Sequence, residues 1–253
     1  MLELSAVSVR KRLEGVSWTA APGQLIGVLG ANGAGKSTLL ACMAGQLSPD
    51  SGGCYWQQQQ VSRMTTQVRR QVISYLPQHP SVSAPVSVGH VLATGLVNLR
   101  LPVALAERVS QVAREFNLTN LLNRPMTQLS GGEQRRVHLA RSLSSDSALA
   151  LCDEPVAGLD LYYQLRVMEL LQQRARSGQL VCIALHDLAL AARYCDKLIL
   201  LHQGQLLASG QPMQVLTTDN LRRAYGIEAR WWCDDDGVAM LPTLCKGEHS
   251  GDL

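Results

Sequence analysis

One segment of this sequence has the residue types needed to bind a phosphate chain, namely Gly30-Ala31-Asn32-Gly33-Ala34-Gly35-Lys36-Ser37. It fits the pattern G-x-x-x-x-G-K-[ST], in which glycines let backbone N–H groups surround an anion. Lys36 would place a cation against the outer phosphates, and the Ser37 hydroxyl would be a ligand for Mg²⁺. An apolar run predicts a strand over Leu25–Leu29, and the residues from Thr38 predict a helix. This strand-loop-helix context favours a nucleotide site over a simple glycine-rich turn.

Further candidates for chemistry follow two other apolar runs. Asp153 and Glu154 end the run that starts at Leu149, and His186 ends the run from Leu180. The carboxyl ends of parallel strands meet at one edge of a sheet, so we expect these side chains to face the phosphate loop. Asp153 is the candidate for holding a metal ion, and Glu154 is placed to orient or deprotonate an attacking water. Taken singly, an acid pair is more often a solvated strand end, and a lone histidine a structural residue.

Two more segments carry residues that suit a nucleotide site. Gln78 follows a predicted strand, Val72–Leu76, and its amide could reach a metal-bound phosphate, although a lone Gln is usually a loop residue. Ser130 precedes a predicted helix over Arg135–Leu143, with Glu133 three residues after the serine, and a capping box explains that pair structurally. The two glycines between them exceed what a cap requires, and they would expose N–H groups to an anion.

The composition describes a folded protein without a strong electrostatic bias. The 253 residues are 46% hydrophobic and carry a net charge of +3, which is too weak to indicate nucleic acid or an anionic membrane as a partner. One Phe, six Tyr and four Trp are too few for a surface that stacks single-stranded bases. Seven cysteines without a C-x-x-C pair indicate reduced, mostly buried thiols in a cytosolic protein. We expect no signal peptide and no membrane-spanning run, so any link to a membrane would go through a partner.

Periodicity predicts how the chain is organised around these residues. Alternating residues over Leu2–Val9 and Gly15–Ala20 predict an antiparallel β layer, and helical spacing over Val103–Phe116 predicts a helix. We expect one domain of class α/β over residues 1–253. Its parts would be a catalytic body (1–82 and 145–230), an inserted helical lobe (83–144) and a tail (231–253) in which Asp234-Asp235-Asp236 forms a solvated turn.

The motifs stand in the order found in the ATP-binding-cassette ATPases, and the sequence resembles this family over nearly its whole length. The residues that carry the resemblance are the phosphate loop, Gln78, Leu129-Ser130-Gly131-Gly132-Glu133-Gln134, the run from Leu149 to Pro155, Ala157-Gly158-Leu159-Asp160 and His186. The resemblance implies a P-loop NTPase cassette with a RecA-like mixed-sheet core, an N-terminal antiparallel β layer and an inserted α-helical subdomain. It also implies ATP and Mg²⁺ as cofactors and ATP hydrolysis coupled to transmembrane transport.

The same resemblance implies roles for individual residues. ATP would be bound by Gly30, Ala31, Asn32, Gly33, Ala34, Gly35, Lys36, Ser37 and Thr38. The catalytic residues would be Glu154, His186 and Gln78, and the metal ligands Ser37, Gln78 and Asp153. Leu129, Ser130, Gly131, Gly132, Glu133 and Gln134 would bind the ATP of a second copy in a head-to-tail homodimer, with Asp160 in the interface loop.

The expected partners also come from the resemblance. The chain would lie peripherally at the cytoplasmic face of the inner cell membrane, with two copies of a polytopic permease subunit. A cleft near Gln78 to Leu101 would receive a permease helix, a periplasmic substrate-binding protein would act indirectly, and no nucleic acid would be bound. The usual aromatic of the first β turn is replaced by Arg10-Lys11-Arg12, so an arginine could stack on adenine instead.

The C-terminal third suggests which transporter is involved. Residues 208–218 and Ala224-Tyr225-Gly226 resemble importer ATPases for iron-siderophore, haem or cobalamin, and the tail resembles most closely those for vitamin B12. The alternative is an iron-siderophore or haem importer. A cassette of DNA repair or translation without a membrane partner is more distant, and an exporter is disfavoured because no membrane domain is fused.

Overall fold

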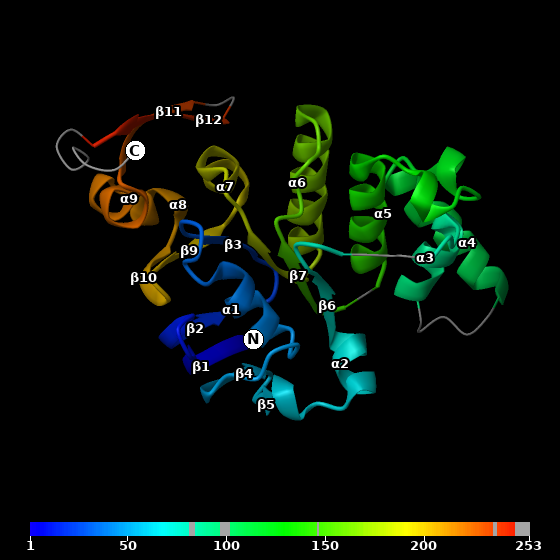
Figure 1. Ribbon diagram of the computed structural model, residues 1–253, viewed down its shortest axis with the longest axis horizontal. Coiled ribbons are helices and arrows are strands. Elements are labelled where there is room, and N and C mark those ends of the chain that lie inside the picture. Colours follow the sequence, from blue (N-terminus) through cyan, green and yellow to red (C-terminus); the bar gives the residue numbers. More distant parts are fainter. Residues whose placement is uncertain (81–83, 97–101, 146, 235–236, 246–253) are drawn as a thin grey trace.

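A computed structural model describes residues 1–80, 84–96, 102–145, 147–234 and 237–245, and its centre is a mixed sheet of six strands (Figure 1). The sheet order is β10-β9-β3-β8-β7-β6, with β10 antiparallel to β9 and the other neighbours parallel. The strands are β3 (Leu25–Leu29), β6 (Ile73–Leu76), β7 (Leu149–Asp153), β8 (Leu180–Ala184), β9 (Lys197–His202) and β10 (Gln205–Gly210). Every residue of β3, β7 and β8 is buried, because both faces of the sheet are covered. The continuous apolar runs of the sequence therefore correspond to the central strands.

An antiparallel β layer lies over one face of this sheet, and helix α1 (Lys36–Met43) packs between the two. Its order is β2-β1-β4-β5, formed by β1 (Leu2–Val9), β2 (Leu13–Ala20), β4 (Ser51–Trp56) and β5 (Gln59–Gln60). The predicted pairing of the first two strands is confirmed, with Leu4 opposite Trp18. Leu39 and Met43 of α1 share one buried cluster with residues of β1 and β3. This cluster fixes the helix that follows the phosphate loop.

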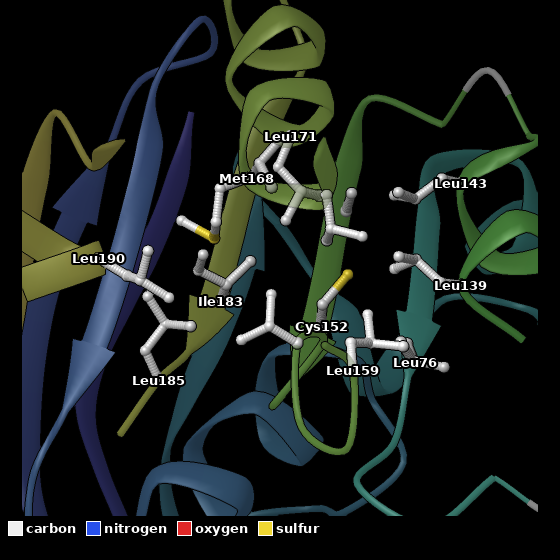
Figure 2. Close-up of a cluster of buried hydrophobic side chains, with 14 of the residues drawn as sticks. Leu76, Leu139, Leu143, Cys152, Leu159, Met168, Leu171, Ile183, Leu185 and Leu190 are labelled. Atoms are coloured by element: carbon white, nitrogen blue, oxygen red, sulfur yellow. The ribbon is translucent and has the colours of Figure 1, made fainter. Parts of the chain in front are cut away.

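Helices cover the other face of the sheet. In Figure 2, Leu139 and Leu143 of α5 (Gly131–Leu143) lie on one side of Cys152 of β7, and Met168 and Leu171 of α6 (Leu161–Arg176) lie on the other side, close to Ile183 of β8. All four of these helix side chains are fully buried, and each contributes about 1.5–3 kcal/mol of hydrophobic stabilisation. The packing holds α5 and α6 against the central strands β7 and β8.

The helical region between β6 and β7 lies at one end of the molecule (Figure 1). It contains α3 (Val88–Gly95), α4 (Pro102–Glu115), two 3₁₀ turns (Thr119–Leu121 and Met126–Gln128) and α5. A Cβ on Gly95 would approach the Arg141 carbonyl oxygen to 2.2 Å, so glycine permits the close crossing of α3 and α5. The sequence placed the start of α5 at Arg135, whereas the helix begins at Gly131 because Ser130 caps it.

Several elements have no counterpart in the sequence-based prediction. They are a short 3₁₀ turn (Val61–Arg63), α2 (Thr66–Val72), α7 (Leu188–Tyr194), α8 (Pro212–Val215), α9 (Thr218–Tyr225) and a hairpin of β11 (Ile227–Asp234) and β12 (Gly237–Leu244). The hairpin lies beside α7 and α9 (Figure 1), and Trp231 and Met240 pack against the core. The predicted solvated turn at Asp234–Asp236 falls partly outside the described residues. None of the helices described is long and apolar enough to cross a bilayer.

Candidate active site

The phosphate loop connects β3 to α1 with a backbone that requires glycine. Gly30, Gly33 and Gly35 have φ values of 148°, 80° and 105°. A Cβ on Gly30 would approach the Leu201 carbonyl oxygen to 2.5 Å, and one on Gly35 would approach the Arg12 carbonyl oxygen to 2.8 Å. The loop is therefore closed in by neighbouring backbone, and larger residues at these two positions would displace it.

Lys36 is held inside this loop rather than extended into solvent. Its side chain is 6% exposed, and Nζ donates to the carbonyl oxygens of Gly30 at 2.7 Å and Ala31 at 3.2 Å. Burial lowers the pKa of Lys36, and the nearby charges of Glu154 and Asp153 oppose this effect. The ammonium group is thus fixed at the first residue of α1, where a phosphate would meet it together with the helix N-terminus.

A cleft of about 310 Å³ opens above the loop. It is lined by Arg12, Asn32, Gly33, Ala34, Gly35, Lys36, Ser37, Thr38, Gln78, Glu154 and His186. Gln78, Glu154 and His186 follow β6, β7 and β8, which are consecutive in the sheet, and they therefore reach the same edge. The structure brings together the three residues that the sequence proposed as catalytic. Arg12, from the turn between β1 and β2, lies at this cleft too, and its stacking on adenine stays a prediction.

Glu154 lies at the centre of a hydrogen-bond network. Its Oε1 accepts a bond from Gln78 Nε2 at 2.8 Å and lies 2.5 Å from His186 Nε2. Burial raises the pKa of Glu154, but the bonds from His186 and Gln78 and the charges of His186 and Lys36 outweigh it, so the pKa lies below its usual value. The residue is therefore a carboxylate at neutral pH. Its backbone has φ of 52°, a left-handed conformation that is uncommon for a non-glycine residue and typical of functional sites.

Asp153 has the features of a metal ligand. It is 1% exposed, and its Oδ1 has no hydrogen-bond partner among the described residues. The carboxylate accepts a hydrogen bond from the Ser37 side chain. Burial is the main influence on the pKa of Asp153 and raises it. An unsatisfied buried carboxylate oxygen is costly unless a ligand or ion completes it. Asp153, the Ser37 hydroxyl and the Gln78 amide offer the oxygen ligands that Mg²⁺ prefers, so these residues fit that ion.

Arg135 is a functional candidate that the sequence analysis missed. The side chain is buried, and Nη1 donates to the Gln78 carbonyl oxygen at 2.7 Å. Nη2 donates to the carbonyl oxygens of Asp153, at 2.9 Å, and of Glu154. One guanidinium from α5 thus fixes the backbone of two cleft residues, Gln78 and Glu154, and of the adjacent Asp153. No sequence signal identifies it, because its partners are main-chain groups far away in the chain.

The segment Leu129–Gln134 lies away from the cleft, and none of its six residues, all of them described, lines it. Ser130 is exposed, and Glu133 Oε2 accepts bonds from its backbone N and its Oγ, each at 2.8 Å. The predicted capping box is confirmed. The bonds from Ser130 lower the pKa of Glu133. The helix N-terminus at Gly131 therefore does not line the phosphate-loop cleft of its own chain.

The predicted interface residue Asp160 also lies outside the cleft. Its side chain accepts a bond from the Tyr163 backbone at 2.9 Å and so caps α6. The preceding loop passes beside the start of α5, where an added Cβ on Gly132 would lie 3.7 Å from the Gly158 carbonyl oxygen. Asp160 and the glycines of α5 are therefore on adjoining segments.

The described cysteines are free thiols, and most of them are buried. Cys42, Cys54, Cys152, Cys182 and Cys195 are free and buried, and Cys245 is free and half-buried. Burial raises the pKa of each of the five buried thiols, for example that of Cys54 to about 12. The side chain of Cys233 lies outside the described part. The buried thiols are thus poor nucleophiles with no part in the chemistry of the cleft.

Comparison with known proteins agrees with this geometry. Residues 13–157 match the family described as ABC transporter. The chain is 40% identical over 228 residues to the hemin import ATP-binding protein HmuV of Bordetella parapertussis, covering 86% of this chain and 87% of that protein. Among solved structures, a chain described as a metal-chelate type ABC transporter in an inward-facing conformation superposes with a TM-score of 0.81 at 24% identity, covering 97% of this chain and 98% of that one.

A second solved structure is the ATP-binding cassette MJ0796, described as dimeric in a post-hydrolysis state bound to ADP and Pi. It superposes with a TM-score of 0.77 at 22% identity, covering 84% of this chain and 99% of that one. The two structures confirm the predicted cassette fold. Because the family match spans more than half of the sequence and the 40% identity extends over 86% of it, the chain belongs to the ABC transporter family and is an ATP-hydrolysing cassette whose turnover is coupled to transport.

Proposed function

We propose that this chain is the ATPase subunit of a bacterial importer for haem or a related iron chelate. The relative from Bordetella is named for hemin import, and a similar structure is described as a metal-chelate type transporter. These names favour the alternative expected from the sequence, a haem or iron-siderophore importer, over the first expectation of vitamin B12. The observation that carries the ATPase assignment is the convergence of Gln78, Glu154 and His186 on the phosphate loop.

The proposed chemistry is attack of water on the γ-phosphate of ATP, which yields ADP and phosphate. Glu154, ionised at neutral pH, accepts the proton of that water. His186 and Gln78 hold the Glu154 carboxylate in the free protein and are placed to turn toward the γ-phosphate. Lys36 and the backbone of residues Gly30–Thr38 bind the phosphates. Ser37, Gln78 and Asp153 would hold Mg²⁺, which supplies charge neutralisation on the phosphate oxygens.

The segment Leu129–Gln134 is proposed to complete the site of a second copy in a head-to-tail homodimer. Two features support this role. Ser130 and Gly131 are exposed at a helix N-terminus, and the similar cassette MJ0796 is described as a dimer. Asp160, next to this segment, would lie in the interface loop. Each ATP would then lie between Lys36 of one copy and Gly131 of the other.

A second cleft, of about 430 Å³, is the proposed contact with a polytopic permease subunit. It lies between the proposed body and the proposed helical lobe (83–144), and Arg69, Arg70 and Arg141 line it together with Thr94 and Gly95. Among the described residues no carboxylate lines this cleft, and the buried Ser142 Oγ there lacks a hydrogen-bond partner. Its charge therefore suits an acidic cytoplasmic segment. Two permease copies would hold the dimer at the inner face of the membrane, with a periplasmic binding protein delivering the cargo.

A chromosomal Glu154→Gln replacement tests the proposed cargo. Loss of growth on haemin or a ferric siderophore as sole iron source, with growth on cobalamin unaffected, supports the proposal. Loss of cobalamin-dependent growth alone would restore the vitamin B12 assignment, and unaffected growth on all three would point to a cassette without a permease. Glu169→Gln, which alters an exposed ion pair with Arg166, is the matched control.

Copurification tests the proposed membrane partner. Arg141→Glu should abolish capture of a polytopic membrane protein by the tagged chain, because it places a negative charge in the arginine-lined cleft. Arg176→Glu changes an exposed residue at the end of α6 and should leave capture intact. Equal capture by both variants would contradict this docking site.

A further inference from the structure

A tyrosine near the end of the chain contacts the first residue of the phosphate loop. Tyr225 is the last residue of α9, and its Oη accepts a hydrogen bond from the Gly30 backbone N–H at 2.8 Å. The two residues are 195 positions apart in the sequence. Tyr225 does not line the cleft, and the sequence analysis gave its side chain no role.

This bond holds the N–H of Gly30, while Lys36 holds the carbonyl oxygen of the same residue. The Gly30 carbonyl oxygen accepts the bond from Lys36 Nζ at 2.7 Å, and its N–H is satisfied by the tyrosine. Gly30 is buried, so its N–H depends on this partner within the fold. A buried N–H without an acceptor is costly, and a loop that can move will move to satisfy it. The tyrosine hydroxyl thus fixes the point from which the loop starts.

The tyrosine itself is firmly placed. Leu221 and Ala224 of α9 are buried in the core, and Gly226 ends the helix in a left-handed conformation with φ of 67°. The adjoining strand β11 packs against α9. Burial, opposed by the bond from Gly30, raises the pKa of Tyr225 to about 12, so the side chain is a neutral hydroxyl at physiological pH.

We propose that Tyr225 is a positioning residue for nucleotide binding, through which α9 holds the phosphate loop in its binding conformation. Without the hydroxyl the free loop relaxes, and nucleotide binding must restore its shape at the expense of affinity. The inference goes beyond the transport proposal, because it holds whatever cargo the complex carries.

The test compares Tyr225→Phe with Tyr194→Phe in the full chain. Tyr194 is buried, whereas Tyr225 is half-buried, and the Tyr194 hydroxyl has no hydrogen bond to a described residue, so Tyr194 serves as the control. We expect Tyr225→Phe to raise the Kd for a fluorescent ATP analogue and the KM for ATP by about tenfold, equal to about 1.4 kcal/mol. The kcat should stay within about twofold. The control should match wild type in all three quantities.

A purely structural role would give a different pattern. A lower melting temperature without nucleotide, together with unchanged Kd and KM, would overturn the proposal, and so would a fall in kcat alone. Amide exchange of ¹⁵N-labelled glycine adds an independent readout. Gly30 should lose protection in Tyr225→Phe and regain it at saturating ADP, whereas unchanged protection of Gly30 in the free variant would contradict the proposal.

Discussion

The phosphate-loop cleft and the start of α5 are the two described surfaces that would meet a triphosphate in the proposed dimer, and they differ in how their polar groups are satisfied. At the cleft, Lys36 and the neighbouring Asp153 are almost fully buried, and Asp153 Oδ1 has no hydrogen-bond partner among the described residues. At the start of α5, Ser130 is exposed, and Glu133 already occupies its N–H and hydroxyl. In the single chain, the first surface therefore has a polar group ready for a ligand, whereas the polar groups of Ser130 at the second surface are already bonded to Glu133. An arriving nucleotide must compete with Glu133 only at the second surface.

The largest expected effect breaks the chemistry of the cleft without touching the second surface. Glu154→Gln keeps the side-chain shape but removes the proton acceptor, so ATP turnover should fall by about 10²- to 10⁴-fold. Phosphate release in single-turnover experiments measures the loss, and titration with a fluorescent ATP analogue should show binding within a few-fold of wild type. Hydrolysis at the wild-type rate would remove Glu154 from the proposed role.

The next prediction breaks the second surface alone. Ser130→Arg places a long cation where two copies would meet, so ATP-dependent dimerisation in a Glu154→Gln background should weaken by at least about tenfold. Light scattering coupled to gel filtration measures the dimer, and ATP affinity of the monomer should not change. Ser177→Arg, at the exposed end of α6, is the control. Dimers as stable as those of the control would count against the head-to-tail arrangement.

A smaller effect concerns the ionisation of Glu154. Because its folded pKa lies below the usual value, it stabilises the protein above its unfolded pKa, and this contribution is lost as pH falls through the folded pKa. The acidic limb of kcat/KM, which reports the free enzyme, should therefore lie below the usual pKa of a glutamate. Gln78→Ala removes one bond while burial remains, so the limb should move upward by about one pH unit or less. A limb at the same pH in both proteins would show that Gln78 does not tune Glu154.

The smallest predicted effect sharpens the contrast between the two surfaces. Glu133→Gln can keep the capping box, since glutamine also serves at this position, and it removes a negative charge beside the proposed phosphate site. ATP-dependent dimerisation should strengthen by a few-fold, while thermal stability without nucleotide stays nearly unchanged. Weaker dimerisation would mean that the carboxylate assists closure instead of opposing it.

The sequence predicted the buried strands and the cleft well for a physical reason. β3, β7 and β8 are covered on both faces, so each reads as a continuous apolar run, and the chemistry-bearing residues follow them directly. By contrast, α2 has no buried residue and therefore no apolar stripe to detect. The hairpin of β11 and β12 depends on pairs such as Trp231 with Met240, which only the folded chain reveals.

Within the site, motif residues could be predicted but their supports could not. Glu154 and His186 follow strand ends, which the sequence marks. Arg135 and Tyr225 act on carbonyl and amide groups of the main chain, and such groups are the same in every residue type. A pattern of side chains therefore carries no record of these contacts.

The position of Arg135 has a consequence for communication between active sites. Its guanidinium holds the main chain at Gln78 and Glu154, and it lies in the helix that begins at Gly131. In the proposed dimer, that first turn would touch the ATP of the opposite copy. The first turns of this helix would then connect the ATP of one copy to the general base of the other copy. The conformation of each active site would in this way depend on whether ATP is bound at the other.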